Sequence, residues 1–338
     1  MRPWTVVLTG AGGFIGGATL DALRRTHEPD GRPVRVRAVV RTPPPSDADR
    51  APGVRWVTAD LTDPASLHGL FEGADAVVHA ASYVGPDEAT ADAVNRAGTA
   101  SLMARASAAG VPRLVQLSTV AVYGRGPHRG AAEDELAPAP GSVASRTRLA
   151  GEPSTLAAGG LVLRAGLVLG AGDRWVVPAL ADLVRRVPAH WDGGQALLSV
   201  VAVEDLARLL TAAALAPRPV TGVYHAGHPA PVRNRDLLAA LAEHDLLPPL
   251  AADLPWPDCL RRLRSTDGWV SERQFVLLGR DHYYRSDRAW QRLDCPPGPG
   301  PLARLDSAAA WYRDHLRIST SGTRSEGRSA ARACDPAV

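Results

Sequence analysis

The chain has 338 residues, of which 45% are hydrophobic and 22% are charged, and its formal net charge is +3. This composition excludes a wholly disordered chain, and the length allows one large or two small domains with a substantial core. The net charge is small, and no basic helix carries interleaved aromatic residues, so nothing indicates a nucleic-acid partner.

The cysteines give no sign of a metal site or a disulfide framework, because Cys259, Cys295 and Cys334 are scattered and odd in number. The N-terminus opens on a predicted strand instead of a signal peptide, and no apolar run approaches about 18 residues. We therefore expect a cytoplasmic protein that does not bind membranes. The chain contains no lysine, so all 38 residues counted as Lys or Arg are arginine.

Residues 4–16 have the pattern of a buried strand, a glycine-rich turn and the start of a helix. The glycines recur every third residue, at Gly10, Gly13 and Gly16. Gly10 allows a tight turn, Gly13 lets the backbone approach a pyrophosphate, and Gly16 lets the helix pack closely on the strand. The N–H groups and partial positive charge of the helix N-terminus would then bind the phosphates.

Further strands are predicted to alternate with helices along the first half of the chain. This alternation predicts a doubly wound, parallel α/β sheet of the Rossmann type with right-handed crossovers. The predicted strands after the first cover residues 34–41, 54–59, 74–81 and 113–119.

The end of the second predicted strand bears on cofactor choice. NAD-specific sites usually place an acidic residue here to bind the ribose 2′-hydroxyl. The chain has Arg41 instead, and a guanidinium suits a 2′-phosphate through charge-assisted hydrogen bonds. Arg41 therefore favours NADP, with NAD as the alternative, although a solvated arginine at a strand end would look the same.

Several of these motifs together resemble the extended short-chain dehydrogenase/reductase family. The glycine turn has the sequence Thr9-Gly10-x-x-Gly13-x-x-Gly16. The pair Asp60-Leu61 follows the third strand, and residues 118–124 are similar to the family's SS-x-x-VYG signature. The resemblance extends over roughly residues 3–242. The cofactor-binding residues that it implies are Gly10, Gly13, Phe14, Ile15, Gly16, Arg41, Asp60, Leu61, Ala80, Ala81 and Arg148. Asp60 read alone could instead cap the helix predicted near residue 63, and His79 is expected to be structural.

The chain departs from this family at its catalytic Tyr-x-x-x-Lys pair. Ala144 stands where the tyrosine is expected and Arg148 stands where the lysine is expected. Arg148 can still donate to ribose hydroxyls, whereas an alanine has no proton to give. The resemblance implies that Thr119 faces the substrate carbonyl. The proton would then come from another group, for which Tyr123, Tyr83 and a water held by Thr119 are candidates.

Three functions remain open on this sequence. The first is an NADP-dependent reductase of a small carbonyl compound or nucleotide-activated sugar, in a specialised-metabolite pathway. The second is a redox-neutral cyclase, epimerase or eliminating enzyme, and the third is a nucleotide-binding regulatory protein without turnover. The family's 4,6-dehydratases carry Asp-Glu after the threonine, so Val120-Ala121 argues against that activity. By analogy, a homodimer formed through the fourth and fifth helices is expected.

The predicted domain organisation has two lobes and a tail. Residues 1–170 form the nucleotide-binding domain, and its sheet is completed by about residues 197–227. Residues 171–196 and 228–318 form the substrate-binding lobe. Segment 319–338 is rich in small and polar residues and contains scattered arginines, so it is expected to be disordered.

Overall fold

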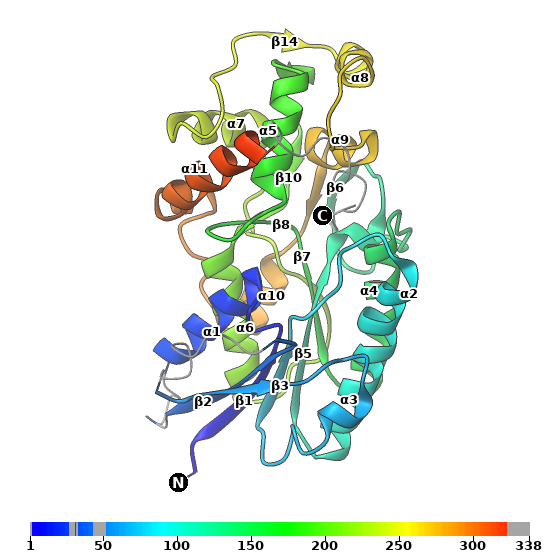
Figure 1. Cartoon of the computed structure of the whole chain (residues 1–338), viewed down its shortest axis with the longest axis vertical. Helices are drawn as coiled ribbons and strands as arrows, with labels where there is room; N and C mark the ends of the chain where they lie inside the picture. The colour runs from blue at the N-terminus through cyan, green and yellow to red at the C-terminus, as the bar shows by residue number, and fades with distance from the viewer. Residues whose placement is uncertain (1, 27–30, 32, 43–51, 323–338) are drawn as a thin grey trace.

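The structure is a computed structural model that describes residues 2–26, 31, 33–42 and 52–322. A parallel sheet with helices on both faces forms the larger lobe, and a smaller lobe rich in helices lies above it in Figure 1. None of the described helices combines the length and apolar character needed to cross a membrane.

The central sheet has seven strands in the order β12-β7-β5-β4-β1-β2-β3, and every pairing is parallel. The sequence therefore predicted the fold class correctly. The order reverses direction beside β1, so the carboxyl ends of β1 and β4 flank the switch point where such sheets bind ligands. The strands are β1 (Trp4–Thr9), β2 (Val34–Val40), β3 (Val54–Thr58), β4 (Ala76–His79), β5 (Arg113–Thr119), β7 (Leu161–Ala165) and β12 (Gly222–His225).

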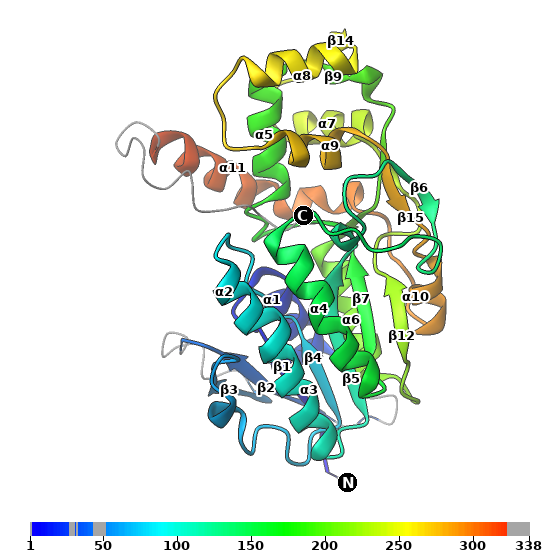
Figure 2. The same ribbon diagram turned by 90° about the vertical axis from the view of Figure 1, so that its right-hand side faces the viewer.

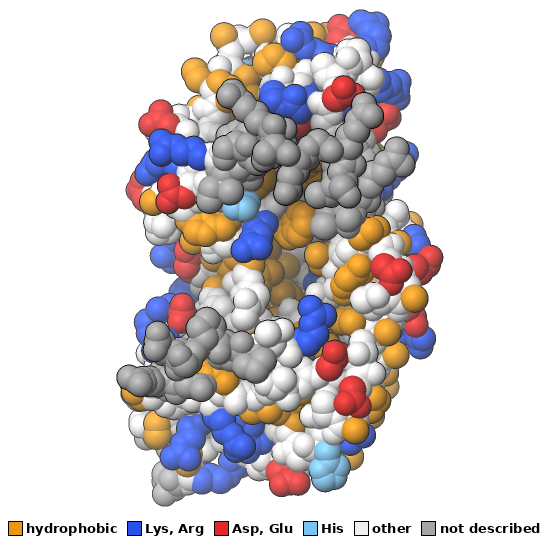
Figure 3. All heavy atoms as spheres, viewed as in Figure 1, with side chains coloured by type: hydrophobic (Ala, Val, Ile, Leu, Met, Phe, Trp, Pro, Cys, Tyr) orange, Lys and Arg blue, Asp and Glu red, His pale blue; other side chains and the backbone are white. Residues whose placement is uncertain are grey.

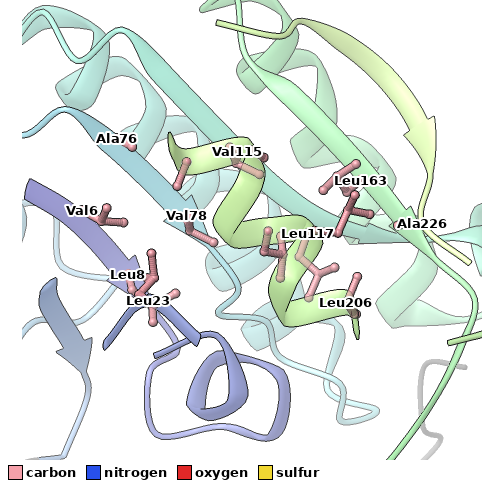
Figure 4. Packing of buried hydrophobic residues seen from close by; sticks show 14 of the residues in the cluster. Val6, Leu8, Leu23, Ala76, Val78, Val115, Leu117, Leu163, Leu206 and Ala226 are labelled. Carbon is pink, nitrogen blue, oxygen red and sulfur yellow. The ribbon is translucent and has the colours of Figure 1, made fainter. Parts of the chain in front are cut away.

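Helices cover both faces of this sheet, and the alternation of side chains along β1 shows how. Val6 and Leu8 pack in one core cluster with Leu23 of α1 and Leu206 of α6, whereas Val7 belongs to the cluster on the opposite face. Figure 4 shows the first of these clusters, and Figure 2 shows α3 and α4 in front of the sheet. The helices of this lobe are α1 (Phe14–Arg25), α2 (Glu88–Ala91), α3 (Thr99–Ala108), α4 (Val143–Ala157), α6 (Val203–Leu215) and α10 (Asp287–Arg292), with a π-helix η3 (Asp92–Gly98) and the turns η2 (Pro64–Leu67) and η4 (Val120–Tyr123).

The smaller lobe has its own core around Trp191, Phe275 and Leu180, which are all fully buried. A four-stranded sheet, β13-β10-β15-β6, joins it to the larger lobe. Its helices are α5 (Val176–Arg186), α7 (Asn234–Glu243), α8 (Trp256–Arg264), α9 (Glu272–Gly279) and α11 (Leu305–Gly322), and the turns are η5 (Asp192–Gly194) and η6 (Leu302–Arg304). The remaining strands are β6 (His128–Ala131), β8 (Leu167–Leu169), β9 (His190–Trp191), β10 (Leu197–Leu198), β11 (Val200–Ala202), β13 (Val232–Arg233), β14 (Asp253–Leu254) and β15 (His282–Tyr284).

Two local expectations need revision. Helix α11 continues to Gly322, past residue 319 where the sequence suggested the start of a tail, and residues 323–338 lie outside the described chain. The helical turn η2 is capped by Asp63, which accepts from the Ala65 N–H at 3.0 Å. Asp60 does not cap it, because its carboxylate instead accepts from Thr62.

Candidate active site

The glycine-rich turn after β1 is built so that only hydrogen fits at two of its positions. Gly10 has φ = +73°, and a Cβ there would lie 2.7 Å from the backbone N of Ala81. A Cβ on Gly16 would lie 1.9 Å from the carbonyl oxygen of Gly10. The absence of side chains thus lets the carboxyl ends of β1 and β4 and the first turn of α1 meet in backbone contact.

The N-terminus of α1 is free to bind an anion. Gly13 is its N-cap, so no side chain caps the helix, and the first turn from Phe14 and Ile15 contains no acidic residue. The first N–H groups of a helix have no intrahelical acceptor, and they carry the positive end of its dipole. This arrangement fits the pyrophosphate of a dinucleotide, as the sequence predicted.

The ends of β2 and β3 supply the residues expected around the adenosine half of the cofactor. Thr62 donates to Asp60 through both its backbone N–H and its hydroxyl at 2.8 Å, which lowers the pKa of Asp60, and the nearby charge of Arg41 acts in the same direction. Arg41 is exposed at the end of β2. Leu61 packs against Gly98 of η3, where a Cβ would lie 2.8 Å from it.

His79 ends β4 and ties the strand to its neighbours. Its Nδ1 lies 2.7 Å from the hydroxyl of Thr9, and its Nε2 lies 3.0 Å from the hydroxyl of Thr99 on α3. The ring is buried, and this burial, with the charge of Arg148 nearby, lowers the pKa of His79 to about 4. His79 is therefore neutral at physiological pH and structural, as expected.

The lowered pKa of His79 predicts a loss of stability in mild acid. The unfolded chain takes up a proton below its ordinary pKa of 6.5, whereas the folded protein does so only near pH 4. The free energy of unfolding should therefore fall by up to about 3 kcal/mol between those pH values. Urea unfolding across this range measures it. His79→Gln should make the free energy of unfolding depend less on pH. Part of the dependence should remain, since the pKa values of His225 and His282 are also lowered.

Thr119 ends β5 at the same edge of the sheet. It is 5% exposed, and its Oγ1 accepts from the Ala121 N–H at 3.1 Å, which leaves its own proton available for a ligand. Arg148 of α4 reaches this edge, where its Nη2 donates to the carbonyl of Leu117 at 3.1 Å. Its buried Nε has no hydrogen-bond partner among the described residues, so its N–H can donate to a ribose hydroxyl. Burial lowers the pKa of Arg148 to about 10, and the side chain stays charged at neutral pH.

Position 144 offers no acid. Ala144 is 1% exposed, and the neighbouring hydroxyls of Ser142 and Ser145 close a capping box at the start of α4. The two serines bond to each other at 2.9 Å, so both are engaged in holding the helix end.

The structure does not support Tyr123 as the replacement proton donor. Its ring is 2% exposed, and its hydroxyl accepts from Arg164 Nη1 at 2.7 Å and lies 2.8 Å from Nε2 of His225. Arg164 in turn pairs with Glu152 at 2.6 Å, and Glu152 accepts from Ser118. No local sequence pattern predicts this network, because its members come from strands and helices far apart in the chain.

A cleft of about 980 Å³ lies where the two lobes meet, within the range of known ligand sites. Its wall begins at the first turn of α1 with Gly13 and Phe14, and continues over Arg174 and Trp175 to α6 and α11. Thr119 and Arg148 do not line this cleft, so it adjoins the phosphate-binding turn and not the expected position of the substrate carbonyl. Figure 3 shows the surface hollowed between the lobes on this face.

The chain matches the model of the NAD dependent epimerase/dehydratase family over residues 6–227. It belongs to this family. The match contains the glycine turn, Thr119 and the α4 segment. Family members include NAD(P)-dependent oxidoreductases, epimerases and dehydratases that act on small molecules.

Two similar family members are carbonyl reductases by name. The chain is 31% identical over 260 residues to a 2-alkyl-3-oxoalkanoate reductase of Stenotrophomonas maltophilia, covering 70% of this chain and 75% of that protein. It is 30% identical over 246 residues to 4-hydroxy-2-methyl-3-oxo-4-farnesyl-3,4-dihydroquinoline-1-oxide ketoreductase of Stigmatella aurantiaca, covering 70% and 72%.

A solved family structure supports a nicotinamide dinucleotide as the cofactor. MoeE5 in complex with UDP-glucose and NAD is 25% identical, with a TM-score of 0.66 over 93% of this chain and 99% of that chain. The uncapped α1 and the glycine contacts of the present structure fit such a cofactor.

Proposed function

We propose that the protein is an NADP-dependent reductase of a small carbonyl compound or nucleotide-activated sugar in a specialised-metabolite pathway. The observation that carries this proposal is the position of Thr119. Its buried hydroxyl has a proton to donate at the sheet edge where the glycine turn and Arg148 would hold the dinucleotide. The names of the two ketoreductase relatives point to the same class of reaction.

Each residue has a defined part in this reaction. When bound, a reduced nicotinamide supplies a hydride to the carbonyl carbon. The first-turn N–H groups of α1 hold the pyrophosphate, and Arg148 donates to ribose hydroxyls. Thr119 donates to the carbonyl oxygen, which stabilises the negative charge that develops there.

The absence of an acid at position 144 favours one alternative, a redox-neutral cyclase or epimerase on the same scaffold. Such an enzyme would bind the dinucleotide without net consumption. The third alternative, a regulatory protein, would bind it without any turnover. Cofactor oxidation therefore separates the proposed reductase from both alternatives.

The test is carbonyl-dependent oxidation of NADPH by the purified protein. We expect the NADPH absorbance to fall with ethyl 2-methylacetoacetate or another 2-alkyl-3-oxo ester, and tryptophan fluorescence to report NADPH binding. Binding without oxidation by any oxo ester, aromatic ketone or nucleotide-activated keto sugar would contradict the reductase. An absence of binding would contradict all cofactor-dependent functions.

Arg41 should determine the preference for NADPH. A hydrogen bond to a charged group contributes about 1.5–3 kcal/mol, so Arg41→Gln should weaken NADPH binding by about 10- to 100-fold and leave NADH binding unchanged. Fluorescence titration measures both constants. Arg35→Gln, at an exposed position earlier on β2, is the matched control. Equal losses for both cofactors would show that Arg41 does not contact the 2′-phosphate.

By analogy with the family, we further propose a cytoplasmic homodimer. The two-helix interface expected from the sequence would involve the η3–α3 segment and α4, which pack against each other in the protomer. Light scattering at several protein concentrations tests the dimer, and a mass equal to one chain throughout would exclude it.

A further inference from the structure

A reductase with this site lacks the usual tyrosine that supplies the proton for the product. The hydroxyls nearest to Ala144 belong to the capping box of α4, and the hydroxyl of Tyr123 is occupied by Arg164 and His225. General acid help is worth about 10²- to 10⁴-fold in rate, so its source matters for the reaction. This question rests on the reductase function proposed above.

A second cavity lies directly beside the end of β5. Its volume is about 20 Å³, which admits one water molecule or one oxygen atom of a ligand. Val120 and Ala121, the two residues that follow Thr119, form one wall. Tyr284 and His282, which point to the same face of β15, line the other side.

Tyr284 carries a phenol with no protein partner in this cavity. The residue is 4% exposed, and no hydrogen bond to its hydroxyl is found within residues 2–26, 31, 33–42 and 52–322. The hydroxyl oxygen is not one of the fully buried atoms that lack a partner, so it reaches open space, where a water or a ligand oxygen is expected to bind it. Burial also raises the pKa of Tyr284, so the phenol keeps its proton at neutral pH.

The ring of Tyr284 is held in a fixed position. It stacks on Tyr123 with ring centroids 5.3 Å apart and an interplanar angle of 28°. The backbone N–H of Tyr284 donates to Ser199 Oγ at 2.9 Å, and Ser199 also lines the cavity. The Tyr123 network thus acts as a rigid support for a second tyrosine whose hydroxyl remains free.

We propose that Tyr284 of β15 is the proton donor that α4 lacks. Its hydroxyl hydrogen-bonds the substrate oxygen, directly or through the one water that the cavity admits. When hydride adds to the carbonyl carbon, a C–H bond forms, the C=O π bond breaks and the oxygen gains a negative charge. The oxygen takes the phenolic proton, the Tyr284 O–H bond breaks, and solvent later reprotonates the phenolate. A reduced nicotinamide, when bound, would be the reductant: it would supply this hydride from its own C–H bond.

The test compares three single substitutions of tyrosine by phenylalanine. Tyr284→Phe should lower kcat for ethyl 2-methylacetoacetate by about 100-fold or more. NADPH affinity by fluorescence and the melting temperature should stay close to wild type, and the solvent deuterium isotope effect on kcat should change. Tyr283→Phe is the matched control. Tyr283 directly precedes Tyr284 on β15, and its ring lies beside Gly130 on the other face of the strand. Tyr83→Phe tests the partly exposed rival near the end of β4.

A crystal structure with NADP⁺ gives a readout that needs no substrate. We expect a water or ligand oxygen within hydrogen-bond distance of the Tyr284 hydroxyl. A hydroxyl bonded to a protein group, or a closed cavity, would overturn the proposal. Normal kcat in Tyr284→Phe, or a loss in Tyr83→Phe alone, would also overturn it while leaving the reductase function standing. If the wild-type protein oxidises no NADPH with any carbonyl compound, both proposals are wrong.

Discussion

Gly16→Ala is expected to weaken dinucleotide binding and destabilise the larger lobe. The added methyl carbon would lie 1.9 Å from the carbonyl oxygen of Gly10 and 2.6 Å from its carbonyl carbon. Both are backbone atoms, so no side-chain rotation relieves the clash and α1 must move away from the turn. Overpacking of this kind costs about 1–3 kcal/mol. The N–H groups of the displaced first turn would no longer point at the pyrophosphate. We therefore expect NADPH affinity to fall about tenfold or more.

The adjacent glycine supplies the control for this prediction. A Cβ on Gly17 would meet nothing closer than the Ala11 carbonyl oxygen at 3.7 Å. Gly17→Ala should therefore stabilise the helix by about 0.5–1 kcal/mol and leave NADPH binding intact. Thermal unfolding and fluorescence titration measure both variants. If Gly16→Ala bound NADPH as well as Gly17→Ala, the close contact between helix and turn would not form the cofactor site.

Thr119→Val should lower kcat by about 10²- to 10³-fold, the usual effect of removing one hydrogen-bond donor from a developing oxyanion. Valine has nearly the same shape, so KM and NADPH affinity should change little. Steady-state kinetics with ethyl 2-methylacetoacetate measures the separate constants. An unchanged kcat would mean that Thr119 does not face the substrate.

Thr119 also caps η4 by accepting from the Ala121 N–H, and a structural effect must be separated from a catalytic one. Thr119→Ser keeps both the acceptor and the proton, so it should retain most of kcat. A different outcome would be a lowered melting temperature in Thr119→Val together with lost activity in Thr119→Ser. In that case Thr119 would only hold the backbone of η4 in place and would not contact the substrate carbonyl.

The sequence predicted the features that depend on local backbone geometry. Gly10 and Gly16 were expected in a tight turn between a strand and a helix, and the structure shows backbone contacts there that a Cβ would break. His79 was expected to be structural, and its ring bridges Thr9 and Thr99. These features were predictable because a strand, a turn and a helix leave periodic signals over a few residues.

The proton donor could not be read from the sequence in the same way. Tyr123 was one of three candidates, with Tyr83 and a water held by Thr119, yet its hydroxyl is engaged by a histidine 102 residues away. Tyr284 gave no motif signal, and it reaches the end of β5 only because β15 pairs with β6 beside η4.

By itself, the sequence determined the parallel α/β sheet and the glycine-rich turn after its first strand. Apolar periodicity and the steric needs of glycine are local properties, so they survive in a linear string of residues. Only the tertiary structure decided which hydroxyl groups are free and which are already bonded. That outcome depends on partners brought together from distant elements, and packing between the two lobes selects them.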